Sequence, residues 1–279
     1  MSQYMRSPWG PAAVLVAGVL VAGSASGCAT EPAADEPMPA TGANPQADAG
    51  LNTLTAQERA DGWRLLFDGQ TTAGWRNAHG DSFPEKGWEV RNGELVVIES
   101  GGGEAAHGGD IVTADQYGDF DLMMDFKLTP GANSGIKYNV TEKLGTPGRG
   151  SAIGLEYQLL DDAAHPDANQ GIDGNRKLGA LYDLMPVPED KPFRGIGEWN
   201  TARIVSRGRQ VEHWLNGTKI LEYERGSDEF RRLVAGSKYK VFPGFGEADS
   251  GHILLQDHGN SVSFRNIKIK GEPVAASGT

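Results

Sequence analysis

The stretch Gly154-Leu-Glu-Tyr-Gln-Leu-Leu-Asp161 alternates apolar and polar side chains and then ends in acidic residues. Successive side chains of a β-strand point to opposite faces, so the alternate apolar positions are expected to face a core. Glu156 and Gln158 then share the other face, while Asp161 and His165 lie where the strand ends. Because a polar row is costly to bury without partners, this face is either a functional cleft or plain solvated surface.

The chain on both sides of this stretch is typical of short strands separated by turns. Asn92-Gly93 and Asn216-Gly217 are two-residue turns of the kind that join antiparallel strands. Strands are expected at residues 63–67, 88–91, 94–98, 110–113, 120–128, 133–140, 154–160, 179–182, 199–205, 210–215, 218–223, 251–256 and 262–269. This pattern predicts an all-β fold, an antiparallel β-sandwich of the jelly-roll type whose curved sheet offers a ligand groove.

Little helix is expected beside the strands. One short N-terminal helix begins after Thr55 as its N-cap, with Glu58 completing a capping box and Gly62 ending the helix. Residues 228–234 are consistent with a second, short surface helix. The segment between His165 and Trp199 has no regular pattern apart from the strand mentioned above. A loop of that length inside a compact domain is usually functional or disordered, and its prolines favour a laid-down course.

The composition limits the size of the core and the class of partner. The chain has 279 residues, of which 38% are hydrophobic, enough for one all-β domain with a single core. Its formal net charge of −11 argues against nucleic acid as a partner, because phosphate binding requires a basic surface. Neutral ligands, sugars among them, remain open.

The N-terminus has the pattern of an export signal. Residues 1–27 combine a short basic region with an apolar run too short for an ordinary membrane-spanning helix. They end in Ala-Ser-Gly before Cys28, which resembles a bacterial lipobox and implies lipidation of that cysteine. A secreted protein with an incidental thiol is the alternative. Residues 28–52 are expected to be a disordered tether, 53–272 the folded domain and 273–279 a tail.

This arrangement predicts a location and one membrane contact. The protein is expected to be exported and anchored by its lipid to the bacterial cell envelope, with the outer membrane as the favoured site. The anchor would be its only contact with the membrane. The sequence leaves open whether the domain faces the periplasm or the cell surface.

Several motifs, taken in order, resemble one known family. They are Asn133-Ser-Gly-Ile136, the 154–161 stretch, Gly179-Ala-Leu-Tyr182, Glu198-Trp-Asn200, His213-Trp-Leu-Asn-Gly217, Gly251-His-Ile-Leu-Leu-Gln-Asp-His-Gly259 and Phe264-Arg-Asn-Ile267. As an ordered set they are similar to the 3-keto-disaccharide hydrolase domain family over about residues 62–271. The resemblance implies a concanavalin-like β-sandwich that acts on glycosides oxidised to a ketone at sugar carbon 3. Some members work by elimination followed by hydration.

That chemistry needs a base, an acid for the leaving group and a positive group near the enolate oxygen. The carboxylates and imidazoles that the motifs supply make Glu156, Asp161, His165 and His258 the candidate catalytic residues. A divalent metal ion of unknown identity is a possible source of the positive charge. Its expected ligands are Glu156, Asp161 and His165.

The expected contacts to the small-molecule carbohydrate come from polar and aromatic side chains in the same motifs. They are Asn133, Lys137, Gln158, Tyr182, Trp199, His213 and Gln256. Three of these residues have an alternative interpretation without substrate contact: Tyr182 and Trp199 as core residues, and His213 as a solvent-facing residue. Lys137 replaces an arginine common in the family, which loses bidentate geometry. The other histidines, His79, His107 and His252, are placed on the surface by default.

Two other functions fit the same fold. A non-catalytic carbohydrate-binding module of the lectin type would need mainly aromatics and amides, whereas this chain adds a cluster of carboxylates and imidazoles. An ordinary glycosidase would need two carboxyl groups about 5 to 5.5 Å apart in its retaining form. The sequence lacks a Glu-x-Asp-x-x-Glu strand of the kind that such sandwiches use. Cleavage of 3-keto-glycosides therefore ranks first.

Overall fold

The structure is a computed structural model, and it describes residues 50–101, 103, 107–141, 144 and 152–274. The predicted signal peptide, the lipidation site Cys28, most of the tether and the last residues of the tail lie outside the described residues. Export and lipid anchoring therefore stay predictions. None of the described helices is long and apolar enough to cross a membrane.

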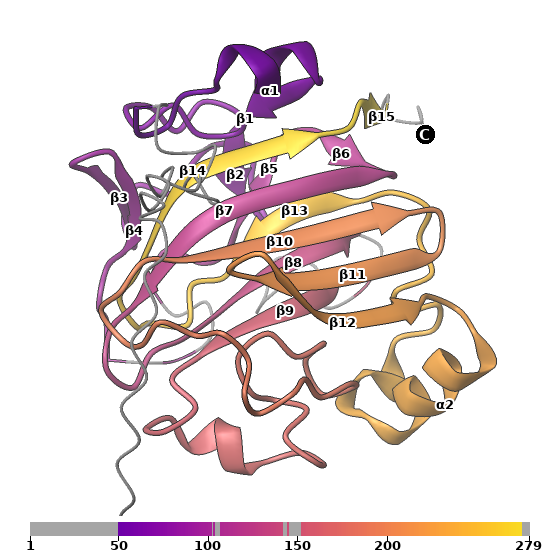
Figure 1. The fold of residues 1–279 in the computed structure, drawn as a ribbon. Coiled ribbons are helices and arrows are strands. Elements are labelled where there is room, and N and C mark those ends of the chain that lie inside the picture. The colour runs from indigo at the N-terminus through magenta and orange to yellow at the C-terminus, as the bar shows by residue number, and fades with distance from the viewer. Residues whose placement is uncertain (1–49, 102, 104–106, 142–143, 145–151, 275–279) are drawn as a thin grey trace, which may run out of the picture. The chain divides into compact units, whose positions relative to one another are not determined.

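The described chain forms two antiparallel sheets, and Figure 1 shows the larger one in front of the smaller. The larger sheet has eight strands in the order β12-β11-β10-β7-β14-β4-β3, with β1 paired to β14. Their bounds are β1 Trp63–Leu65, β3 Trp88–Arg91, β4 Glu94–Val97, β7 Phe120–Leu128, β10 Asn200–Arg207, β11 Gln210–Leu215, β12 Thr218–Glu224 and β14 Val262–Lys270. The predicted antiparallel sandwich is confirmed.

The smaller sheet has five strands in the order β2-β5-β13-β8-β9. They are β2 Trp75–Asn77, β5 Ile111–Thr113, β8 Asn133–Val140, β9 Leu155–Leu160 and β13 His252–Leu255. A separate pair joins β6 Gln116–Tyr117 to β15 Pro273–Val274. The helical elements are α1 Ala56–Ala60, η1 Pro166–Asn169, α2 Asp228–Gly236 and η2 Lys238–Val241. Both predicted helices are therefore present.

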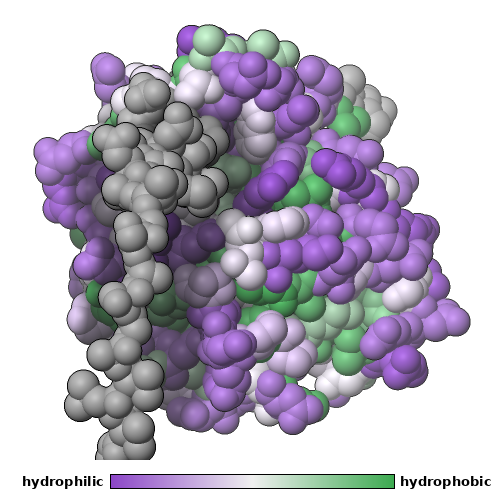
Figure 2. All heavy atoms as spheres, viewed as in Figure 1, coloured by the Kyte–Doolittle hydropathy of each residue, from purple (hydrophilic) through white to green (hydrophobic). Residues whose placement is uncertain are grey.

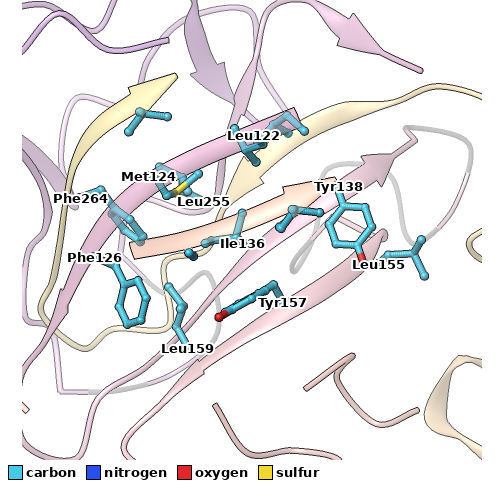
Figure 3. Close-up of a cluster of buried hydrophobic side chains, with 14 of the residues drawn as sticks. Leu122, Met124, Phe126, Ile136, Tyr138, Leu155, Tyr157, Leu159, Leu255 and Phe264 are labelled. Atoms are coloured by element: carbon cyan, nitrogen blue, oxygen red, sulfur yellow. The ribbon is translucent and has the colours of Figure 1, made fainter. Parts of the chain in front are cut away.

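One hydrophobic core lies between the sheets, and Figure 3 shows side chains from both layers pointing toward one another. In β9 the alternate apolar side chains Leu155, Tyr157 and Leu159 are completely buried in this core. They face residues of β7 such as Met124 and Phe126 across the sandwich. The predicted alternation of β9 is confirmed, and it sends Glu156 and Gln158 to the outer face of the smaller sheet. Figure 2 shows hydrophilic side chains over most of the opposite, visible face of the molecule.

The local signals in the sequence act as expected. Asn92 and Gly93 both have positive φ, 53° and 76°, which is the geometry of a two-residue hairpin turn between β3 and β4. At α1, Thr55 accepts a hydrogen bond from Glu58 N while the Glu58 side chain accepts one from Thr55 N. This is the predicted capping box.

The folded domain reaches slightly beyond the predicted limits at both ends. Asn52, placed in the tether, is buried and exchanges two hydrogen bonds of 2.8 Å with Asn266. Its side-chain amide also donates to Gly93 O at 2.8 Å. Pro273 and Val274, placed in the tail, pair with β6. These contacts depend on distant partners, so composition alone did not indicate them.

Candidate functional site

A small polar pocket lies on the outer face of the five-stranded sheet. Its lining residues are Asn133, Glu156, Gln158, Tyr182, Lys238, Gln256 and His258. We call it the polar pocket; it holds about 260 Å³ of open space including its mouth. All of these residues except Lys238 were predicted site residues. The structure thus brings together side chains from β8, β9, the loop after β13, the long loop and η2.

The backbone of β8 makes room for the carboxylate at the centre of the pocket. Glu156 and Gln158 lie opposite Lys137 and Gly135 in the β8–β9 ladder. A Cβ atom on Gly135 would lie only 2.1 Å from Glu156 Oε1. Any other residue at position 135 would therefore displace the carboxylate. Glu156 and Gln158 are 4% and 1% exposed, so this polar row is covered and is no solvated surface.

The cover comes from residues 179–182, which lie alongside β9. Gly179 N donates to Gln158 O at 2.8 Å, Gln158 N donates to Ala180 O at 3.1 Å, and Tyr182 N donates to Glu156 O at 3.0 Å. The predicted strand is thus present as a short paired segment, with one bridge between Tyr157 and Leu181. This pairing carries the Tyr182 side chain over the polar pocket.

A network of charges fixes Tyr182 in place. Its hydroxyl donates to Asp167 at 2.7 Å, and Arg176 binds both Asp167 at 2.9 Å and Asp183 at 2.7 Å. The second oxygen of Asp183 accepts from the Lys238 backbone N at 2.8 Å. Burial and the hydrogen bond to Asp167 raise the pKa of the Tyr182 hydroxyl, so it stays protonated. The network joins the long loop to η2, the two segments that frame the pocket.

Lys238 is the site residue that sequence reasoning missed. Its Nζ lies 4.2 Å from the ring centroid of Tyr182 and 5.2 Å from that of Tyr239, on the exposed side of η2. The turn that holds it is capped by Ser237, whose hydroxyl accepts from Tyr239 N at 3.0 Å. No motif marks this lysine, because only the tertiary fold brings η2 to β9. It adds an ammonium group to the lining of the polar pocket.

Two buried polar atoms of the pocket have unused hydrogen-bonding capacity. Gln158 Nε2 donates to Asn133 Oδ1 at 3.2 Å, but Gln158 Oε1 and His258 Nδ1 have no hydrogen-bond partner within the described part of the chain. His258 is held in its loop by Asp257, whose oxygens accept from Gly108 N, Gly109 N and Gly259 N at 2.9 to 3.0 Å. Buried polar atoms normally have hydrogen-bond partners, so the expected partner of these two atoms is a ligand hydroxyl or a water molecule.

Asp161, a predicted catalytic residue and metal ligand, does not line the polar pocket. Its oxygens accept hydrogen bonds from Gly131 N at 2.8 Å, Ala163 N at 3.1 Å and Ala164 N at 3.2 Å. The carboxylate thus closes the turn after β9. A strand-end Asp commonly has this role, since its side chain hydrogen-bonds to nearby backbone amides.

His165 borders the site without lining the polar pocket. Its Nδ1 accepts from Asp167 N at 3.2 Å, which caps η1, and its ring lies 6.0 Å from that of His258 in an edge-on arrangement. Burial lowers the pKa of His165, and the nearby His258 has a smaller effect in the same direction. The hydrogen bond from Asp167 N shows Nδ1 as an acceptor, so this imidazole caps η1 beside the His258 ring.

The predicted metal ligands do not fit a metal site. No group of three or more His, Cys, Asp or Glu side chains gathers to hold an ion among the residues that the structure describes. The oxygens of Asp161 already accept hydrogen bonds from backbone amides, and so does Nδ1 of His165. Metal binding normally requires deprotonated, available donors, so we derive no step through a metal.

Three of the predicted substrate contacts lie elsewhere. Lys137 lines a neighbouring cavity, described below. Trp199 lies against the larger sheet, with Lys127 Nζ 4.5 Å and the Arg265 guanidinium 3.9 Å from its ring centroid. His213 is completely buried between the sheets, so its predicted contact to a sugar is wrong, and so is the solvent alternative. The surface placement of His252 is also wrong, since it is 4% exposed.

The burial of His213 predicts a loss of stability in acid. Its Nδ1 lies 2.9 Å from Gly179 O and its Nε2 2.7 Å from the Tyr138 hydroxyl, and burial lowers its pKa from 6.5 to about 4. Between those pH values the unfolded chain binds a proton here and the folded chain does not. The free energy of unfolding should therefore fall by about 3 kcal/mol as pH drops from 7 to 4 through this group.

Urea unfolding of the His213→Gln variant at both pH values measures this contribution. The pH-dependent loss should be smaller in the variant by about that amount, whatever its stability at pH 7. His79→Gln, which removes an exposed imidazole, is the control for the loss of a histidine side chain. An unaltered pH dependence in His213→Gln would contradict the assignment.

Comparison with known proteins identifies the family. A family model described as a 3-keto-alpha-glucoside-1,2-lyase-like domain matches residues 62–270. A 3-keto-disaccharide hydrolase of Bacteroides thetaiotaomicron is 36% identical, over 93% of this chain and 96% of that protein. The chain belongs to the 3-keto-alpha-glucoside-1,2-lyase-like family.

Solved structures agree with this membership. The lyase-like domain superposes on a protein of Parabacteroides distasonis ATCC 8503, described as a glycosyl hydrolase, with a TM-score of 0.69 and 34% identity. The match covers 80% of this chain and 100% of that one. A second glycosyl hydrolase of that organism, 27% identical, has a TM-score of 0.55 over 75% of this chain and 99% of the other. The resemblance noted from the sequence motifs is confirmed.

Proposed function

We propose that this protein cleaves the glycosidic bond of glycosides whose sugar carries a ketone at carbon 3. One observation carries the proposal: a carboxylate, an ammonium group, an imidazole and three amides line a single small pocket. The family description and the name of the Bacteroides thetaiotaomicron relative support this class of substrate. A binding module would need the amides and Tyr182 but not both a carboxylate and an ammonium group.

The reaction begins with removal of the hydrogen on carbon 2. The ketone at carbon 3 makes this hydrogen acidic, and Glu156 takes the proton as general base. The electron pair of the broken C–H bond delocalises into the ketone as an enolate. Amide NH₂ groups of Asn133, Gln158 and Gln256 belong to the lining of the pocket, and in this mechanism they stabilise the oxygen that gains charge.

Departure of the leaving group completes the elimination. The enolate re-forms the ketone, a double bond forms between carbons 1 and 2, and the bond from carbon 1 to the glycosidic oxygen breaks. Lys238 donates a proton to that oxygen, so the leaving group departs as a neutral alcohol. The products are this alcohol and an unsaturated 3-keto sugar, to which water can add across the double bond. With this addition the net reaction is hydrolysis.

Paired substrates test the proposal. The protein should release methanol from methyl 3-keto-α-glucoside and leave methyl α-glucoside intact, as measured by chromatography. In D₂O, elimination followed by hydration should place deuterium on carbon 2 of the released sugar, beyond the exchange seen without enzyme. Cleavage of the plain glucoside alone would refute the proposal. Cleavage without deuterium uptake would retain the substrate class and replace elimination by direct hydrolysis.

A chelator arm of this assay tests the metal that the sequence resemblance implied. The proposed mechanism uses amide donors at the enolate oxygen and Lys238 at the leaving group and includes no metal, so turnover should persist after prolonged treatment with a chelator. Loss of turnover that returns on addition of a divalent cation would support the sequence-based prediction instead. In that case the roles of Glu156 and Lys238 would need revision.

A further inference from the structure

A second, larger cavity adjoins the polar pocket. Its lining includes Lys137, Ile153, Lys238, Tyr239, Val241 and Phe242, and it has about 640 Å³ of open space including its mouth. We call it the apolar cavity. Nothing in the mechanism above uses this space, although one of its walls is the catalytic segment η2.

The two cavities meet at Lys238. This residue lines both, and its Nζ lies between the ring of Tyr182 in the polar pocket and the ring of Tyr239 in the apolar cavity. The β8–β9 ladder is a second link, because Lys137 of the apolar cavity and Glu156 of the polar pocket are directly opposite each other in the register of the two strands. The bond that Lys238 protonates therefore lies at the boundary between the two spaces.

Apart from Lys137 and Lys238, the side chains that line the second cavity are apolar or aromatic. Val241 is 66% exposed, which is unusual for a large aliphatic side chain, and Phe242 beside it is half-buried. The floor is rigid because Tyr239 is buried and stacks on Phe245, with ring centroids 4.0 Å apart and an interplanar angle of 14°. Exposed apolar surface that lines a concavity marks a site for an apolar ligand.

We propose that the apolar cavity binds the leaving group and selects glycosides with an apolar aglycone. The inference rests on the proposed function, because it places the cleaved bond beneath Lys238. The apolar cavity has more than twice the open space of the polar pocket, about 640 Å³ against about 260 Å³ with their mouths included, so it is the larger space beside Lys238. A second sugar would need several hydrogen-bonding partners, but Val241, Phe242 and Ile153 offer apolar contact.

Two alkyl 3-keto-glucosides test this selectivity, because their leaving alcohols are similar in basicity and differ in apolar size. The wild-type protein should have a higher kcat/KM for the cyclohexyl than for the methyl substrate. Val241→Asn should lower kcat/KM for the cyclohexyl substrate by about 10-fold or more, mainly through KM. The methyl substrate should change less than about twofold, because it does not reach this wall.

Ile172→Asn is the matched control, since Ile172 is 68% exposed and lies outside both cavities. This control should leave kcat/KM unchanged for both substrates. Equal losses on both substrates in Val241→Asn, or no loss on either, would overturn the cavity assignment, while turnover of the methyl substrate by the wild-type protein would still support the proposed function. Failure of the wild-type protein on both 3-keto substrates would instead overturn the proposed function and this inference with it.

Discussion

Replacing Glu156 by glutamine should lower kcat/KM on methyl 3-keto-α-glucoside by about 10²- to 10⁴-fold, the usual contribution of a general base. The amide has nearly the same shape as the carboxylate and keeps its place beside Gly135, but it cannot accept the proton from carbon 2. The loss should therefore appear in kcat more than in KM. Steady-state kinetics together with a thermal melt measure both turnover and folding.

Glu94→Gln is the matched control for this variant. Glu94 is a strand carboxylate on the larger sheet that lies 3.4 Å from Lys127, so its loss changes charge by the same amount away from the polar pocket. It should keep full activity. Glu156→Gln should also lose the enzyme-dependent uptake of deuterium at carbon 2. Retention of activity and of deuterium uptake would remove Glu156 from the reaction.

Replacing Lys238 by methionine should produce a loss that depends on the leaving group. Methyl 3-keto-glucoside should lose about 10²-fold or more in kcat/KM, because the methoxide oxygen needs a proton as it departs. For 4-nitrophenyl 3-keto-glucoside the loss in kcat/KM should be much smaller, because 4-nitrophenolate departs without protonation. A plot of log kcat/KM against leaving-group pKa should thus become steeper in the variant.

Lys240→Met controls for the loss of a positive charge from η2. Lys240 is also exposed and lies in the same turn, but it does not line either cavity. Its replacement should leave the slope and the rates unchanged. If Lys238→Met loses activity equally on all leaving groups, Lys238 positions Tyr182 or the substrate and does not donate the proton.

The sequence predicted the sandwich and much of the polar pocket because strand alternation is a local property. In β9 the period of two sends the apolar side chains inward and Glu156 and Gln158 outward, and the structure follows this pattern. The same rule would have placed His213 correctly. It has the parity of Val211 and Leu215 in β11, and all three are completely buried. The sequence interpretation placed His213 at a sugar or in solvent because its ring is polar. Its hydrogen bonds to Gly179 and Tyr138 satisfy both ring nitrogens, which allows the ring to be buried.

The remaining errors concern contacts that no local pattern specifies. Asp161 belongs to the same acidic stretch as Glu156, but its backbone partners include Gly131 in the preceding turn, far away in the chain. Lys238 follows a surface helix and enters the site only because Asp183 and Tyr182 of the long loop lie against η2. Trp199 matched a motif, yet the cations beside it belong to strands of the other sheet. Such pairings follow from topology, which the residue pattern alone leaves open.

The segment 179–182 also bears on solubility. β9 is the last strand of its sheet, and its residues are buried throughout, so an uncovered β9 would expose a row of unpaired backbone groups to other chains. The hydrogen bonds from Gly179 and Tyr182, together with the one that Ala180 accepts, occupy that edge without adding a long strand. The same few residues therefore protect the protein from edge-to-edge aggregation and hold an aromatic side chain over the polar pocket.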